Sequence, residues 1–245
     1  MAIPIIITFV FGDVVGLLLV LLFLLVFVST NLGLGRGLAV WEKHRVATFY
    51  LIVTLGCCYL GGAEAADWAL SGRQAHFYYQ HYMICDFYTV TIKSYLIFCT
   101  LVFLSVTAEY LLGFAYVNKI NLIEFPLVIC FALFFMLLLV SSFNLFGAYV
   151  SLEGVTFSLY VLAGMRYNSQ NALEAGMKYF CLGVLSSGFL LFGIALVFII
   201  TKTLDFLELR YLFNSINDLP LLLSFALIFI FFGFWFKLSI FPCHA

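Results

Sequence analysis

The chain has 245 residues, of which 65% are apolar and 9% are charged, and its formal net charge is -1 at pH 7. Its mean hydropathy is +1.17. A soluble domain carries about 25% charged residues, so this composition excludes a water-soluble fold and indicates a polytopic membrane protein. The small net charge and the lack of a basic run argue against nucleic acid as a partner.

The seven cysteines form no CxxC pair, and most of them lie inside apolar runs. Cys57 and Cys58 are adjacent, a spacing that an ordinary disulfide does not bridge. We interpret all seven as small hydrophobic residues, so the sequence predicts neither a metal site nor a disulfide.

Each transmembrane helix needs about 20 apolar residues. The sequence offers seven such segments, at 4–29, 46–66, 92–114, 125–143, 145–164, 175–201 and 219–241. A short amphipathic stretch at 204–218 has apolar residues at helical spacing and is expected to lie along the membrane interface. We therefore predict an all-α polytopic membrane protein, with the first three helices in residues 1–123 and four more in residues 124–245.

Lys237 lies at the end of the last apolar segment, five residues before Pro242. A lysine inside the bilayer costs about 2.5 kcal/mol or more on insertion scales, and such residues are usually functional. Helices broken at membrane depth are found where the backbone is buried in protein or lines a watery cavity, as at ion-transport sites. The sequence predicts a functional lysine beside a helix break.

Glu153 and Lys178 are two further charges within apolar segments. Glu153 lies near the middle of 145–164, among small residues that let another helix or water approach. Lys178 enters 175–201 and is followed by a second group of small residues. In one interpretation, Glu153 and Lys178 form a buried ion pair that fixes helix packing. In the other, the charged residues transfer protons, because burial and a neighbouring opposite charge shift proton affinity in opposite directions.

His244 follows Pro242 and is the only histidine near the charged residues. It is either a proton relay or a side chain that hydrogen-bonds the broken backbone, and the sequence favours neither. No nucleophilic triad, phosphate loop or metal-ligand cluster is evident.

Three stretches resemble subunit 2 of NADH:ubiquinone oxidoreductase, an antiporter-like membrane subunit of respiratory complex I. Leu152–Ala163 is similar to the fifth helix of that family, and Ala172–Gly183 is similar to its sixth. Phe236–Ser239, with Pro242 and His244, resembles its broken seventh helix. The resemblance covers most of residues 86–245, and the three motifs agree in order and spacing.

The resemblance implies the first inverted-repeat half of an antiporter-like fold. It also implies a proton half-channel in which Glu153 modulates Lys178, Lys178 holds the proton, and Lys237 passes it laterally. No cofactor is expected on this chain, whereas the whole complex uses NADH, FMN, iron–sulfur clusters and ubiquinone. The expected location is the mitochondrial inner membrane, with a bacterial plasma membrane as the alternative, and the expected partners are other membrane-arm subunits.

The family continues beyond the motif at His244 into a second set of helices. We weigh a split gene, a truncated segment and a free-standing variant, and the split gene predicts a second polypeptide that completes the subunit. Two functional alternatives also stand. One is a cation/proton antiporter subunit, which would carry the same charged helices, and the other is a non-pumping structural subunit.

Overall fold

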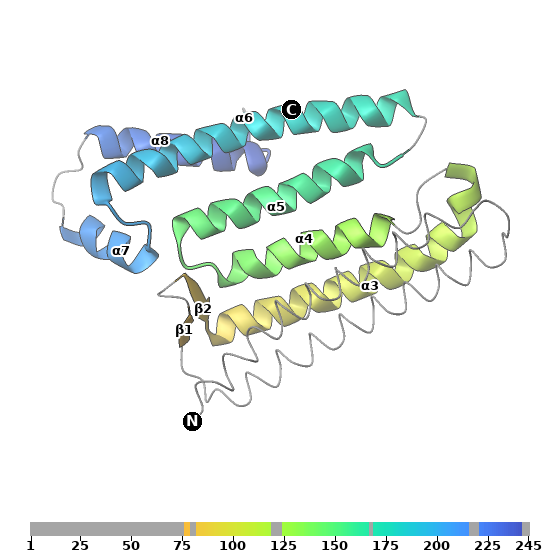
Figure 1. The fold of residues 1–245 in the computed structure, drawn as a ribbon, viewed down its shortest axis with the longest axis horizontal. Helices are drawn as coiled ribbons and strands as arrows, with labels where there is room; N and C mark the ends of the chain where they lie inside the picture. Colours follow the sequence, from red (N-terminus) through yellow and green to blue (C-terminus); the bar gives the residue numbers. More distant parts are fainter. Residues whose placement is uncertain (1–75, 79–81, 119–123, 167–168, 216–220, 242–245) are drawn as a thin grey trace, which may run out of the picture.

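The computed structural model describes residues 76–78, 82–118, 124–166, 169–215 and 221–241 (Figure 1). The expected helices at 4–29 and 46–66 lie outside these residues. In chain order the described elements are β1 (His76–Tyr78), β2 (Met83–Cys85), α3 (Phe87–Asn118), α4 (Glu124–Ser141), α5 (Leu145–Gly164), α6 (Gln170–Thr201), α7 (Phe206–Ser215) and α8 (Leu221–Lys237).

Four of the described helices, α3 to α6, are long and apolar enough to cross a membrane. The prediction of an all-α polytopic membrane protein is confirmed, and α5 has the bounds expected from the sequence. α6 begins five residues before the predicted start at residue 175. The apolar helix α8 has 17 residues, so it is about 25 Å long and shorter than the roughly 30 Å hydrocarbon core of a bilayer.

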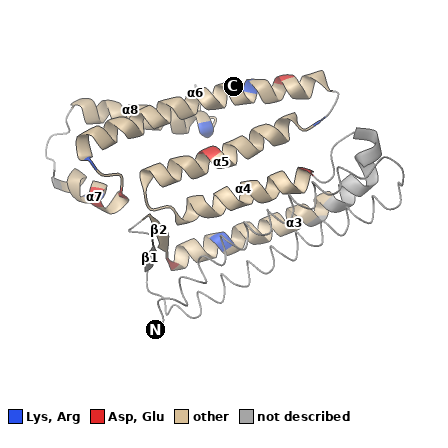
Figure 2. Cartoon of the chain, viewed as in Figure 1, with Lys and Arg blue, Asp and Glu red and all other residues tan. Residues whose placement is uncertain are grey.

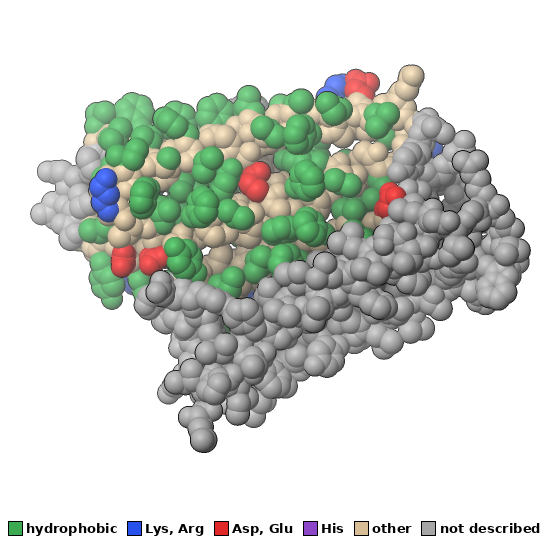
Figure 3. Space-filling model, in the orientation of Figure 1, with side chains coloured by type: hydrophobic (Ala, Val, Ile, Leu, Met, Phe, Trp, Pro, Cys, Tyr) green, Lys and Arg blue, Asp and Glu red, His purple; other side chains and the backbone are tan. Residues whose placement is uncertain are grey.

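Helices α3, α4, α5 and α6 lie side by side in chain order, and α8 packs against α6 (Figure 1). Charged residues are sparse along the helices (Figure 2), and hydrophobic side chains cover much of the described face in Figure 3. Many large apolar side chains are exposed, among them Phe98, Phe157 and Phe192. An apolar exterior is expected where lipid replaces water as the solvent.

Small residues bring α6 and α8 into close contact. A Cβ added at Gly193 would lie 2.9 Å from the carbonyl oxygen of Ala226, and one at Gly233 would lie 2.7 Å from the Cβ of Leu190. Close backbone approach at small residues is a recurrent mode of helix association in membranes. This packing fixes the depth of Lys237, the last residue of α8.

The two short strands were not predicted from the sequence. β1 and β2 pair in antiparallel register, with Phe77 opposite Ile84. Beside this hairpin, the backbone N–H of Phe143 donates to the carbonyl oxygen of Tyr82 over 2.8 Å, and that of Leu145 donates to Leu204 over 3.0 Å. The hairpin, the α4–α5 turn and the α6–α7 turn are thus joined at one end of the bundle.

Candidate functional site

Lys237 lies where α8 ends, four residues before the predicted end at residue 241. Ser239 has a positive φ of 52°. The N–H of Ile240 donates to the carbonyl oxygen of Trp235, and the N–H of Ser239 donates to that of Phe236, both over 3.1 Å. These two bonds define a Schellman motif, a helix ending that usually carries glycine at the left-handed position. The predicted interruption is therefore present and lies before Pro242.

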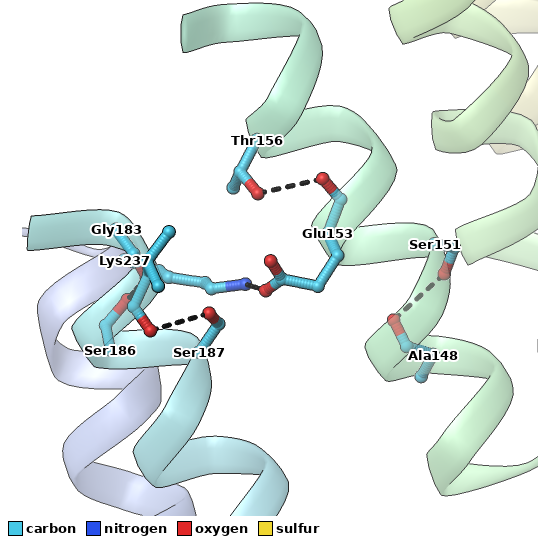
Figure 4. A network of polar contacts seen from close by, with 9 residues as sticks. Ala148, Ser151, Glu153, Thr156, Gly183, Ser186, Ser187 and Lys237 are labelled. Atoms are coloured by element: carbon cyan, nitrogen blue, oxygen red, sulfur yellow. Dashed lines mark hydrogen bonds and ion pairs between the residues drawn. The ribbon is translucent and has the colours of Figure 1, made fainter. Parts of the chain in front are cut away.

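Glu153 lies near the middle of α5, which begins at a well-formed cap. The side-chain oxygen of Asn144 accepts a hydrogen bond from the N–H of Phe146 over 2.9 Å, so one of the free donors at the helix start is satisfied. Next to Glu153, the ring of Phe135 on α4 occupies the space over Gly154. The chain therefore packs α5 against α4 through Gly154, while Figure 4 shows the Glu153 side chain directed toward Lys237.

The Nζ of Lys237 donates to Oε1 of Glu153 over 2.7 Å, which joins α8 to α5. The Lys237 side chain is 12% exposed and that of Glu153 is 30% exposed. Lys237 is the last residue of α8 and Glu153 lies near the middle of α5, so the two charges meet within the bundle. Removing one member of a partly buried charged pair is costly, since the other member is left without compensation.

Hydroxyl groups surround the ion pair (Figure 4). Thr156 donates to the backbone carbonyl of Glu153 over 3.0 Å. Ser186 and Ser187 on α6 are 2% and 7% exposed, and each donates to a carbonyl of its own helix. A hydroxyl that has donated its proton still has oxygen lone pairs that accept hydrogen bonds. The site therefore offers acceptors for an ammonium group or for water.

Lys178 lies apart from the Glu153–Lys237 pair, so the interpretation in which Glu153 and Lys178 form a buried ion pair is wrong. Lys178 instead pairs with Glu174, one turn earlier on α6, over 2.6 Å. It is nine residues from Ser187, which corresponds to about 13 Å along the helix. Gly176 packs against the backbone of Gly164, the last residue of α5. Lys178 thus lies near the end of α5, whereas Glu153 lies deep in it.

The sequence contained a signal for the Glu174–Lys178 pair, and that signal was missed. Glu174 and Lys178 stand at i and i+4, with the glutamate first, which is the favourable order for a pair on one helix. Ser186 and Ser187 were recognised as close-packing residues, and their place beside the ion pair became clear only in three dimensions. His244 lies outside the described residues, so its role stays a prediction. Within the described ranges, no three His, Cys, Asp or Glu residues gather as a metal site.

The family described as "NADH:quinone oxidoreductase/Mrp antiporter, TM" matches residues 142–245, which include both members of the ion pair. Subunit N of NADH-quinone oxidoreductase from Bartonella bacilliformis is 36% identical over 168 residues, which are 69% of this chain and 34% of the relative. Subunit N from Coxiella burnetii is 31% identical over 215 residues, 85% of this chain and 42% of the relative. The chain spans less than half the length of these relatives.

Two solved structures share the fold. A chain of respiratory complex I from Thermus thermophilus matches with a TM-score of 0.66 at 22% identity, over 95% of this chain and 45% of that one. A chain of an archaeal membrane-bound sulfane sulfur reductase, a respiratory membrane complex, matches with a TM-score of 0.64 at 21% identity, over 98% and 46%. The resemblance to the antiporter-like membrane subunits of complex I is thus confirmed, and residues 142–245 match the NADH:quinone oxidoreductase/Mrp antiporter transmembrane family.

Proposed function

We propose that this chain is a proton-translocating subunit in the membrane arm of a complex I-type NADH:quinone oxidoreductase. The observation that carries the proposal is the 2.7 Å ion pair between Glu153 and Lys237, placed inside the helix bundle at the end of α8. Ionisable residues inside a membrane protein are typical of proton pathways. The similarity to subunit N of bacterial NADH-quinone oxidoreductases supports the same assignment.

In the proposed mechanism, Lys237 holds the proton and Glu153 controls its release. The carboxylate stabilises the ammonium group while the two are in contact, whereas apolar surroundings disfavour an unpaired charge. If the pair separates, Lys237 gives its proton to a nearby acceptor such as water and becomes a neutral amine. When the pair forms again, the amine takes up another proton. Because α8 ends at Lys237, a change in the terminal turn alters this distance without moving a whole helix.

Lys178 is assigned a different place in this mechanism from the one the sequence suggested. Its contact with Glu174 and its position near the end of α5 favour a role at the entrance of the path, upstream of Glu153. Ser187, beside the ion pair, lies about 13 Å along α6 from Lys178, so a transfer toward Glu153 requires water or hydroxyl groups between the two sites. His244, which lies outside the described residues, stays a predicted relay.

The proposal extends to partners and location. The other membrane-arm subunits of a complex I are the proposed partners, and NADH, FMN, iron–sulfur clusters and ubiquinone belong to the rest of that complex. The mitochondrial inner membrane stays a prediction, since the relatives compared are bacterial. A second polypeptide that completes the subunit also stays a prediction. Mass spectrometry of the intact native complex tests both partner predictions by identifying every chain that accompanies this one.

The test of the mechanism is the number of protons moved per electron in proteoliposomes that contain the whole complex. Glu153→Gln and Lys237→Ala should each lower this ratio, while NADH oxidation by an artificial electron acceptor should not change. Ser151→Ala is the matched control, because Ser151 lies two residues from Glu153 and its hydroxyl bonds only to carbonyls of its own helix. An unchanged ratio in both Glu153→Gln and Lys237→Ala would overturn the mechanism.

A cation/proton antiporter subunit is the second candidate, because the matching family includes Mrp antiporters. The two candidates differ in what accompanies the chain. Copurification with NADH-oxidising subunits supports the first, and sodium-dependent proton exchange without NADH oxidation supports the second. The non-pumping structural subunit predicts instead that charge-neutral variants impair assembly and leave the proton-to-electron ratio unchanged.

A further inference from the structure

An apolar cavity of about 410 Å³ lies beside α7, at the end of the bundle away from the Glu174–Lys178 pair. Its volume is within the range of about 300–1,000 Å³ that is usual for ligand pockets. The apolar lining comes from four helices: Leu145 of α5, Val197 of α6, Phe206, Leu209 and Phe213 of α7, and Leu227 and Ile230 of α8. The cavity is therefore a product of how α7 packs beneath the two longer helices.

Arg210 and Asn214 are the polar residues of the cavity wall. Arg210 is exposed and forms no ion pair with another described residue. The nearest acidic residue along the helix, Glu208, is two positions away and so does not share its face. Among the described residues, the other acid beside α7 is Asp205, which accepts a hydrogen bond from the side chain of Asn144 over 2.7 Å. The cavity therefore has a positively charged edge.

The charged edge and the apolar wall lie at different depths. α7 is a short amphipathic helix between α6 and α8, as expected of a helix in the membrane interface. Leu227 and Ile230 lie six and nine residues into α8, which is about 9–14 Å from its start. The cavity thus runs from a cation at the interface into the apolar region, and this matches the orientation of a lipid molecule.

We propose that this cavity binds an anionic phospholipid, with the phosphate at Arg210 and one acyl chain against Val197, Leu227 and Ile230. The positive edge selects a negative headgroup, and the wall on α6 and α8 accepts a hydrocarbon chain. A bound lipid would join α7 to the helix that ends in Lys237. The proposal does not depend on proton transfer, because it rests only on the cavity and the membrane setting of the helices.

The whole complex in nanodiscs provides the test. The nanodiscs contain phosphatidylcholine and a small amount of phosphatidylglycerol with a photoreactive diazirine in one acyl chain, and peptide mass spectrometry locates the adducts. The exposed residues of α3, such as Phe98, report labelling by bulk lipid. We expect the α8 segment from Leu227 to Ile230 to be enriched over α3 with phosphatidylglycerol, and less so with a phosphatidylcholine probe. Equal labelling of both helices by the two probes overturns the proposal.

Three variants separate the parts of the site. One basic residue near a membrane surface contributes about 1 kcal/mol to anionic lipid binding, so Arg210→Gln should lower the enrichment about fivefold. Glu208→Gln is the matched control and should retain it. Leu227→Trp fills the cavity and should remove the α8 adducts while leaving those on α3. Full enrichment in Arg210→Gln overturns the phosphate contact, and wild-type α8 adducts in Leu227→Trp overturn the acyl-chain contact. The wild-type measurement decides the proposal even if a variant does not assemble.

Discussion

Two ion pairs in the described helices contain the same residue types but differ in their exposure and in the helices that they join. Glu153 and Lys237 come from different helices, and their side chains are 30% and 12% exposed. Glu174 and Lys178 come from consecutive turns of α6, and their side chains are 64% and 71% exposed. The first pair can form only if α5 and α8 are packed correctly, whereas the second can form on an isolated helix.

This difference predicts which of the two pairs costs more stability when one of its charges is removed. An exposed pair on one helix contributes about 0.3–0.5 kcal/mol, because solvent screens the charges and each side chain loses conformational freedom. A buried pair leaves an uncompensated charge when one partner is removed, at a cost of about 3–5 kcal/mol. The Glu153–Lys237 pair is only partly buried, so its loss should fall toward the lower end of that range.

The largest expected effect is that of Lys237→Ala. The carboxylate of Glu153 would remain within the bundle without its partner, and we expect a loss of about 3 kcal/mol in stability. The thermal unfolding of the complex in detergent, or the amount of assembled complex on a native gel, measures this loss. Glu153→Gln combined with Lys237→Ala should be milder than Lys237→Ala alone, because no charge is then left unpaired. Simple addition of the two single effects would show that the residues are not coupled.

The next effect concerns the packing that holds Lys237 at its depth. Gly233→Val would force α6 and α8 apart, since a Cβ at this position meets Leu190 and the carbonyl oxygen of Ser186. Overpacking of this kind costs about 1–3 kcal/mol, and we also expect less proton pumping because Lys237 shifts relative to Glu153. Gly188→Val is the control, because nothing lies within 4 Å of a Cβ there. If both variants pump protons equally well, proton pumping does not depend on the α6–α8 packing at Gly233.

Helix positions were largely predictable, and the partner of each charge was not. Apolar runs between polar turns place α5 at its predicted bounds, since hydrophobicity along the chain is a local property. The choice between Lys178 and Lys237 as the partner of Glu153 depends on helix depth. That depth is set by contacts between distant segments, such as Gly176 with Gly164. A one-dimensional pattern does not contain this information.

The strands and the end of α8 were missed for a related reason. Three-residue strands such as Met83–Cys85 are too short to show alternation, and their pairing depends on a distant partner. The sequence marks a helix interruption through Pro242, yet α8 ends earlier because Ser239 adopts the left-handed conformation. Serine is not a strong signal for that conformation, whereas glycine is.

A smaller effect is expected at the start of α5. Asn144→Ala removes both the cap on Phe146 and the 2.7 Å hydrogen bond to Asp205. Loss of an N-cap costs about 1 kcal/mol, and the lost side-chain contact weakens the connection between the α6–α7 turn and the α4–α5 turn, which backbone hydrogen bonds still join. Asn144→Ser keeps a cap acceptor and removes the amide donor to Asp205 without placing a second carboxylate against it. A thermal unfolding series that ranks wild type, Ser and Ala in this order supports two separate contributions, whereas equal loss in both variants assigns the whole effect to the contact with Asp205.

The smallest expected effect on stability is that of Lys178→Ala, because the Glu174–Lys178 pair is exposed and contributes about 0.5 kcal/mol at most. Its effect on proton pumping should also be weaker than that of Lys237→Ala, if Lys178 lies at the entrance of the path and water can replace it there. The proton-to-electron ratio of the two variants, measured in the same proteoliposomes, tests this order. Glu174→Gln is the control for the loss of the pair alone. Lys178→Ala could instead stop pumping as fully as Lys237→Ala while Glu174→Gln retains it. That result would show that Lys178 itself carries the proton, and that side-chain exposure does not predict which of the two lysines pumping requires.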